Sequence, residues 1–269
     1  MLENESNQER KEKYYFILIR FWRTTNDEEV LKYILESLSK EEDYSFIASR
    51  LSFIGLQYRP IKDCIPNLIK FFDRGDINFK IIVSGLFSRV EKKIPDMEDK
   101  LLILLTKTKD KNKALTIASA LWPIGSEKSV NSIKSLMNPI GKNEYDSLIL
   151  RIVSDLCGGK CVNFYKDNFI HSRNKHVKNA ALVALYKYSD DMSIADNIFD
   201  RAKTILSRSR KREIAYQENY PPPLVYCLMY LQKIKSDLFD KLLEIIKTDK
   251  SKLFEAEKRH IKNKFNLKI

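Results

Sequence analysis

A degenerate repeat constrains the fold of this chain more than any other feature of its sequence. At intervals of about 35 residues, a small residue is followed by an apolar residue, usually leucine, and then by another apolar residue. The central residues of the copies are Leu51, Leu86, Leu121, Ile152, Leu185 and Leu228. A period of this length is typical of proteins that stack one small supersecondary unit many times.

A second amphipathic segment follows most copies of the repeat. In residues 65–72, 101–105, 130–136, 198–206 and 238–246, apolar residues recur at steps of three and four, as one face of a helix requires. The repeating unit is therefore predicted to be a helix–turn–helix, and seven glycines in 269 residues also favour helix. One helical pair cannot cover its own apolar face, so neighbouring pairs must stack.

Two segments carry a resemblance to a known family. Residues 120–136 resemble the junction of a HEAT repeat, where a first helix ends in Leu-x-x-Ile-Gly and a second begins at valine after a short polar turn. Residues 176–185 resemble the start of a HEAT first helix, with the spacing Val-basic-x-x-Ala-x-x-Ala-Leu. Variable repeat lengths and turns without the consensus aspartate leave the choice between HEAT and armadillo-like repeats open.

This resemblance implies an all-α fold, a right-handed α-solenoid of about six HEAT-like helical pairs. The whole chain, 1–269, would form one such domain. We expect capping helices in residues 1–40, the repeats in 41–248 and a basic C-terminal helix in 249–269.

The charge of the chain is large and uneven. The net charge is +12, with a small acidic excess in residues 1–50 and a strongly basic segment from 201 to the C-terminus. This asymmetry indicates an anionic partner, either a protein with an acidic surface or a nucleic acid. A lysine-rich solvated surface is the alternative.

The basic segment 201–212 and the loop after it supply the candidate binding residues. They are Arg201, Lys203, Arg208, Arg210, Lys211 and Arg212 in the segment, and Tyr216 and Tyr220 in the loop. On a helix, several of the arginines share one side, and guanidinium groups suit carboxylates and phosphates. The alternatives are a solvated end cap of the fold, with its cations near a helix C-terminus, and a loop that only packs its tyrosines.

Cys157, Cys161, His171 and His176 lie close enough in sequence to raise the question of a zinc site. The positions fit helix ends and turns better, so we expect no metal and no cofactor. Four cysteines are too few for a disulfide scaffold, which favours a reducing compartment. With neither a signal peptide nor a membrane span, we expect a cytoplasmic protein that does not contact membranes.

The sequence contains no glycine-rich phosphate loop, nucleophile elbow or HExxH motif. We therefore expect a non-enzymatic scaffold, monomeric on its own, that captures an acidic protein on its concave face. A toxin-immunity protein is one such inhibitor, by analogy of fold alone.

The alternative function is nucleic-acid binding, including an enzyme similar to the alkylpurine DNA glycosylases. That enzyme needs a carboxylate flanked by tryptophans, and Trp122 has only Glu127 nearby. Trp22 and Trp122 are better explained as core residues than as binding anchors. A positive stripe along several second helices would favour nucleic acid, but residues 65–72 and 130–136 carry one lysine each, which favours a protein partner.

Overall fold

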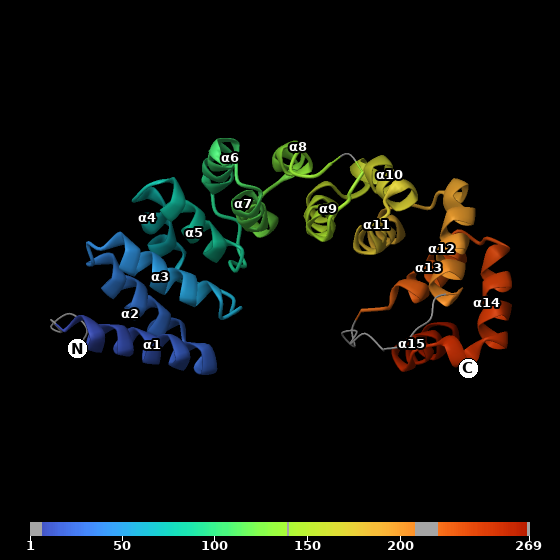
Figure 1. Cartoon of the computed structure of the whole chain (residues 1–269), viewed down its shortest axis with the longest axis horizontal. Coiled ribbons are helices and arrows are strands. Elements are labelled where there is room, and N and C mark those ends of the chain that lie inside the picture. Colours follow the sequence, from blue (N-terminus) through green and yellow to red (C-terminus); the bar gives the residue numbers. More distant parts are fainter. Residues whose placement is uncertain (1–6, 139, 208–219, 268–269) are drawn as a thin grey trace. The chain divides into compact units, whose positions relative to one another are not determined.

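The chain folds into α-helices, as the sequence predicts, and divides into two compact units. The computed structural model describes residues 7–138, 140–207 and 220–267 (Figure 1). Unit 1 is Met1–Leu136 and unit 2 is Met137–Ile269. Within the described residues, helices and 3-10 turns account for the regular structure, together with an isolated parallel bridge between Ile61 and Val90. No helix in these ranges is both long enough and apolar enough to cross a membrane.

Unit 1 consists of helices that follow one another in chain order (Figure 1). They are α1 (Gln8–Thr25), α2 (Glu28–Ser39), α3 (Tyr44–Gly55), α4 (Ile65–Asp73), α5 (Ile77–Phe87), α6 (Met97–Lys107), α7 (Lys111–Ile124) and the short α8 (Val130–Lys134). The odd-numbered helices pack in series, α1 on α3, α3 on α5 and α5 on α7, while α2 packs on α4. Successive helices such as α4 and α5 also pack on each other.

Unit 2 repeats this pattern. Its helices are α9 (Glu144–Cys157), α10 (Val162–His171), α11 (Lys175–Tyr188), α12 (Ala195–Ser207), α13 (Pro223–Lys233), α14 (Leu238–Thr248) and α15 (Glu255–Phe265). Here α9, α11, α13 and α15 pack in series, and α12 packs on α14. Short 3-10 turns at Gly158–Cys161 and Met192–Ile194 lead into α10 and α12.

The repeated apolar positions of the sequence lie on buried faces of helices. Each central residue lies on a helix of the odd-numbered series and is at most 1% exposed. These residues are Leu51, Leu86, Leu121, Ile152, Leu185 and Leu228, on α3, α5, α7, α9, α11 and α13 respectively. The predicted second segments correspond to α4, α6, α8, α12 and α14, although α8 ends at Lys134, before the predicted end of its segment.

Short acidic and amide side chains fix where many of the helices begin. Asp27, Asp43, Asp76, Asp110 and Asn174 each accept a hydrogen bond from a backbone N–H in the first turn of the helix that follows. Such a cap satisfies one of the backbone donors that a helix leaves without a partner at its N-terminus. The sequence therefore sets the starts of these helices locally, and the buried apolar face sets how they pack.

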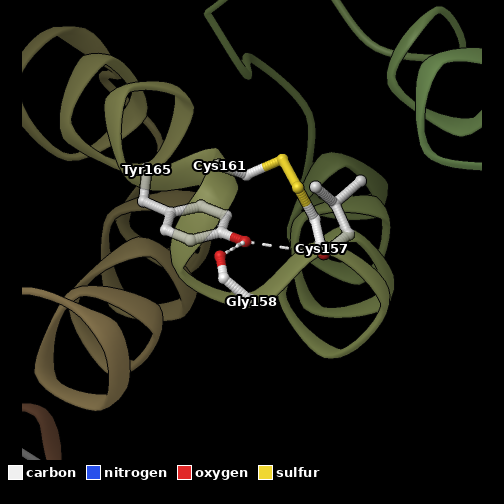
Figure 2. Close-up of a disulfide and its surroundings, with 5 residues drawn as sticks. Cys157, Gly158, Cys161 and Tyr165 are labelled. Carbon is white, nitrogen blue, oxygen red and sulfur yellow. Dashed lines mark hydrogen bonds between the residues drawn. A yellow bond between two sulfur atoms is a disulfide. The ribbon is translucent and has the colours of Figure 1, made fainter. Parts of the chain in front are cut away.

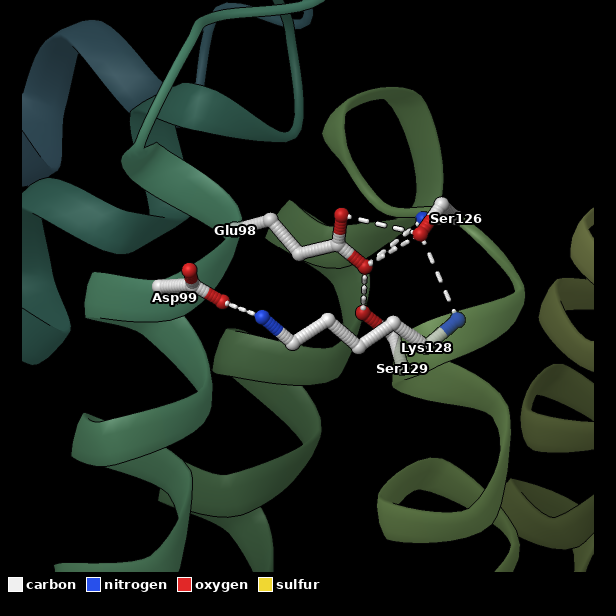
Figure 3. Close-up of polar contacts among 5 residues, drawn as sticks. All are labelled: Glu98, Asp99, Ser126, Lys128 and Ser129. Atoms are coloured by element: carbon white, nitrogen blue, oxygen red, sulfur yellow. Dashed lines mark hydrogen bonds and ion pairs between the residues drawn. The ribbon is translucent and has the colours of Figure 1, made fainter.

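Glu98, at the start of α6, holds the turn between α7 and α8 (Figure 3). Its Oε1 accepts hydrogen bonds from the Ser126 backbone N at 2.8 Å, the Ser126 hydroxyl at 2.9 Å and the Ser129 hydroxyl at 2.5 Å. Beside it, Lys128 forms an ion pair with Asp99. Burial raises the pKa of Glu98, but the hydrogen bonds from Ser129 and Ser126 outweigh it and hold that pKa below its usual value.

Replacing Glu98 with alanine is expected to lower the free energy of unfolding by about 1.5–3 kcal/mol, the range for hydrogen bonds to a charged group. Because the folded-state pKa is depressed, this contribution is complete above the unfolded value of 4.5. It is lost as the pH falls through the folded-state pKa. Urea unfolding of the wild type and the variant at neutral and acidic pH measures the difference.

The matched control for this prediction is Glu42→Ala, which removes an exposed carboxylate from the same unit. We expect this control to change stability little at any pH. A Glu98→Ala variant as stable as the control, or a difference that does not shrink on acidification, would contradict the role of Glu98.

Candidate anion-binding pocket

Positive charge gathers around a cavity in unit 2, between α10, α11 and α12. The cavity has a volume of about 370 Å³. Its walls are Phe169, Ile170, Arg173, Lys175, Lys178, Asn197, Asp200, Arg201 and Thr204. Four of these side chains are cationic and one is a carboxylate, so the lining favours an anion.

Three different elements bring the four cations to this pocket. Arg173 lies in the turn after α10, Lys175 and Lys178 lie on the first turns of α11, and Arg201 lies on α12. Helix α10 packs on α11, and α12 follows α11 after a short turn. Arg201 therefore lines the same cavity as cations about 25 positions earlier in the sequence.

Hydrogen bonds to neighbouring groups fix two of the cations. The Lys178 Nζ donates to the backbone oxygen of Ile170 at 3.0 Å and lies 5.8 Å from the centre of the Phe169 ring. The Arg201 Nη2 donates to Asn179 Oδ1 at 2.8 Å. Both side chains are half-buried, so the pocket presents them in defined positions rather than as mobile surface groups.

The pocket holds more positive charge than its own carboxylate can balance. Asp200 already forms an ion pair with Lys203 at 2.8 Å. Within the described part of the chain, Arg173, Lys175 and Lys178 form no ion pair. Burial, and then the positive charge of Arg201, lower the pKa of Lys178. An anion bound between Lys178 and Arg201 would offset that repulsion and form charge-assisted hydrogen bonds with both.

The predicted binding residues separate in the structure. Arg201 lines the pocket, but Lys203 pairs with Asp200 and lies 5.0 Å from the centre of the Phe199 ring. Tyr220 is 63% exposed, just before α13. Arg208, Arg210, Lys211, Arg212 and Tyr216 lie outside the described residues. Arg173, Lys175 and Lys178 were not among the predicted binding residues, although their close spacing before and within α11 is visible in the sequence.

The four residues considered for zinc do not come together. Cys157 and Cys161 form a disulfide across the end of α9 (Figure 2). His176 lies 3.7 Å from a carboxylate oxygen of Glu144, and His171 is exposed at the end of α10. In the ranges that the structure describes, no group of three or more His, Cys, Asp or Glu side chains could hold a metal ion.

The disulfide was not anticipated from the sequence, which indicated reduced cysteines. Next to it, the buried Tyr165 hydroxyl donates to the backbone oxygen of Gly158 at 2.9 Å (Figure 2) and to the backbone oxygen of Val153 at 3.5 Å. The cross-link and this tyrosine together fix the end of α9. Burial raises the pKa of the other two thiols, Cys64 and Cys227, to about 12, so neither is a reactive nucleophile at neutral pH.

The tryptophans offer little support for a base-binding site. Trp22 is fully buried in the core of unit 1, and Trp122 is half-buried near the end of α7. Comparisons with protein-family models, with curated proteins and with solved structures find no match to this chain. The chemistry that can be assigned is therefore that of the pocket, which can hold a carboxylate or a phosphate group.

Proposed function

We propose that this chain is a HEAT-like α-solenoid that works as a non-enzymatic scaffold and captures a protein with an acidic surface. The observation that carries the proposal is the pocket of Arg173, Lys175, Lys178 and Arg201, whose single carboxylate is already paired. An aspartate or glutamate side chain of the partner would enter this pocket and be held by charge-assisted hydrogen bonds. An inhibitor of the toxin-immunity kind would fit such a scaffold, by analogy of fold.

Helix packing within each unit supports the solenoid part of the proposal. First helices pack on first helices in both units, from α1 to α7 and from α9 to α15. The repeated leucine or isoleucine of each copy is buried in that layer. This is the nearest-neighbour arrangement by which stacked helical pairs build a continuous core.

The distribution of charge favours a protein over a nucleic acid as the partner. A nucleic-acid backbone is held by an extended positive surface that follows its phosphates. The second helices instead carry both signs of charge, with acidic residues beside basic ones on α6, α12 and α14. The acidic members are Glu98, Asp99, Asp196, Asp200, Asp240 and Glu244. A local pocket within a mixed surface suits the recognition of one acidic group.

The test compares the wild-type chain with a variant that carries Arg173→Ala, Lys178→Ala and Arg201→Ala. A control variant carries Lys241→Ala, Lys262→Ala and Lys264→Ala, which removes the same charge from exposed positions of the same unit. The probes are a fluorescent polyglutamate peptide without apolar residues, a mixed-sequence DNA duplex and an RNA strand. Each is titrated at low and at physiological salt.

We expect the peptide to bind the wild type and the control with similar affinity. Its affinity for the pocket variant should be at least about tenfold lower. Nucleic acids should bind weakly, at low salt only, and equally to the two variants, which carry the same charge. Peptide binding that is equal in the pocket variant and the control would refute the pocket. DNA or RNA binding that survives physiological salt and is lost in the pocket variant would replace the proposal with nucleic-acid binding.

A further inference from the structure

A second depression lies in unit 1, between α4, α5 and α6, and its surface is largely apolar. It has a volume of about 260 Å³. Phe72 and Leu104 form its floor and are 3% and 4% exposed. Ile77, at the start of α5, and Ile103, on α6, stand at its sides and are 46% and 56% exposed.

The two isoleucines belong to one apolar surface. Single exposed apolar side chains are common on proteins and need no explanation. Here, however, both isoleucines line the same depression as the apolar floor. Ile103 also lies away from the buried stripe of α6, which is formed by Leu101, Leu104 and Leu105. An apolar floor with exposed apolar sides is a place where one apolar side chain of another molecule can bury its surface.

Lysines surround this apolar surface. Lys80, Lys100 and Lys107 line the depression together with Asp73. Lys100 neutralises Asp73 through an ion pair of 2.7 Å. Among the described residues, Lys80 and Lys107 have no ion-pair partner, and the Lys80 Nζ lies 5.8 Å from the centre of the Phe72 ring. The rim therefore keeps an excess of positive charge around an apolar floor.

We propose that this groove of unit 1 binds a segment of the protein partner in which one large apolar side chain is flanked by acidic residues. The apolar side chain would cover Phe72, Ile77 and Ile103, and the acidic residues would meet Lys80 and Lys107. The volume lies below the roughly 300–1,000 Å³ of small-molecule sites, so it suits one anchor side chain rather than a whole ligand. With a basic rim on a chain of net charge +12, an acidic segment is electrostatically favoured over a second copy of this chain.

The inference rests on the proposed function, because it assumes a protein partner with an acidic surface. It uses none of the pocket residues of unit 2, so the two can fail separately. The probes are three labelled peptides: one with a central phenylalanine flanked by glutamates, the same peptide with a central alanine, and the same peptide with lysines in place of the glutamates.

Two variants of the full chain remove the two parts of the groove. Ile103→Ser removes the apolar side, and Lys80→Glu with Lys107→Glu reverses the rim. Ile17→Ser, at a 59% exposed position on α1, is the matched apolar control. Lys32→Glu with Lys92→Glu is the matched charge control, at exposed positions of the same unit. All of the changed side chains are at least partly exposed, and circular dichroism checks that each variant is folded.

The phenylalanine peptide is expected to bind the wild type and both controls, and to bind each groove variant about tenfold more weakly. The wild type should bind the alanine peptide and the lysine peptide with low affinity. That affinity should be no higher than the affinity of the groove variants for the phenylalanine peptide. The groove variants and their controls are also made in the unit 2 pocket variant, where the glutamates of the peptide no longer report the pocket. The loss caused by the groove variants should persist there, which separates a failure of the pocket from a failure of the groove.

Three results would overturn the inference. The first is no binding of the phenylalanine peptide, or equal binding of the phenylalanine and alanine peptides. The second is an equal loss in the groove variants and their controls. The third is self-association of the wild type, measured by sedimentation, that Ile103→Ser abolishes, because a second copy of the chain would then be the occupant.

Discussion

Replacing Leu51 with alanine is expected to lower the free energy of unfolding by about 2–5 kcal/mol, the range for removing a fully buried leucine side chain. Leu51 is 0% exposed on α3, which packs against both α1 and α5. The shorter side chain loses its apolar contacts and leaves a cavity between helices that can close only in part. Leu56, at the C-terminal end of the same helix, is 61% exposed, so Leu56→Ala should change stability by only about 0.5 kcal/mol.

Urea unfolding distinguishes these two variants, and tryptophan fluorescence can report it. Both of its tryptophans, Trp22 and Trp122, belong to unit 1. Tryptophan fluorescence therefore follows unit 1, while far-ultraviolet circular dichroism follows the helices of both units. A lower midpoint for Leu51→Ala by fluorescence, with little change for Leu56→Ala, is the expected result. Equal effects of the two substitutions would mean that the repeated leucine does not hold the helical pairs together.

Much of the helical organisation could be predicted because burial repeats with the sequence. A residue such as Leu121 or Leu185 meets the same environment in each copy, between the helices before and after its own, so the same residue type recurs. The caps are also local, because an aspartate such as Asp43 bonds to N–H groups two and three residues further on. Helix ends were less predictable: α8 ends at Lys134 although apolar residues continue to Leu136.

The candidate site was predicted only in part, because it depends on contacts between helices. Arg201 could be predicted because many cationic residues surround it in the sequence. Arg173 and Lys178 come close to it only through the packing of α10, α11 and α12. Lys203 belongs to the same charged segment but does not line the pocket. Two residues along a helix correspond to a turn of about 200°, so Lys203 points away from the side that carries Arg201 and pairs with Asp200 instead.

The disulfide shows a similar limit. Four cysteines in a chain of this length predict no cross-linked scaffold. Cys157 and Cys161 meet because the chain turns at Gly158, whose φ of +56° and ψ of −137° together form a conformation that favours glycine. The turn leads from α9 into the 3-10 turn Gly158–Cys161 and brings the two Cα atoms to 5.8 Å. The glycine was visible in the sequence, but its conformation was not.

Replacing Asn168 with alanine is expected to lower the free energy of unfolding by about 2–4 kcal/mol, since an unsatisfied buried donor and a new cavity both contribute. Asn168 is 0% exposed on α10. Its Oδ1 accepts from the Gly141 backbone N at 2.8 Å, and its Nδ2 donates to the Phe164 backbone oxygen at 2.9 Å. Gly141 is tightly packed, since a Cβ atom at this position would come within 2.8 Å of Val177.

Asn163→Ala, at an exposed position on the same helix, is the matched control and should be neutral or slightly stabilising, because alanine has the higher helix propensity. Thermal unfolding followed by circular dichroism measures both variants, and an Asn168→Ala variant as stable as this control would show that the buried amide contributes nothing.

A double variant tests whether the two groups that hold Gly141 act together. The buried Ser172 hydroxyl donates to the Gly141 backbone oxygen at 2.6 Å. Asn168 therefore binds the backbone N–H of Gly141, and Ser172 binds its backbone oxygen. In the Asn168→Ala variant, Gly141 is less firmly positioned, so the hydrogen bond from Ser172 to Gly141 contributes less stability. The loss in the double variant with Ser172→Ala should therefore be smaller than the sum of the two single losses. Strict additivity would instead mean that the two side chains stabilise unit 2 independently.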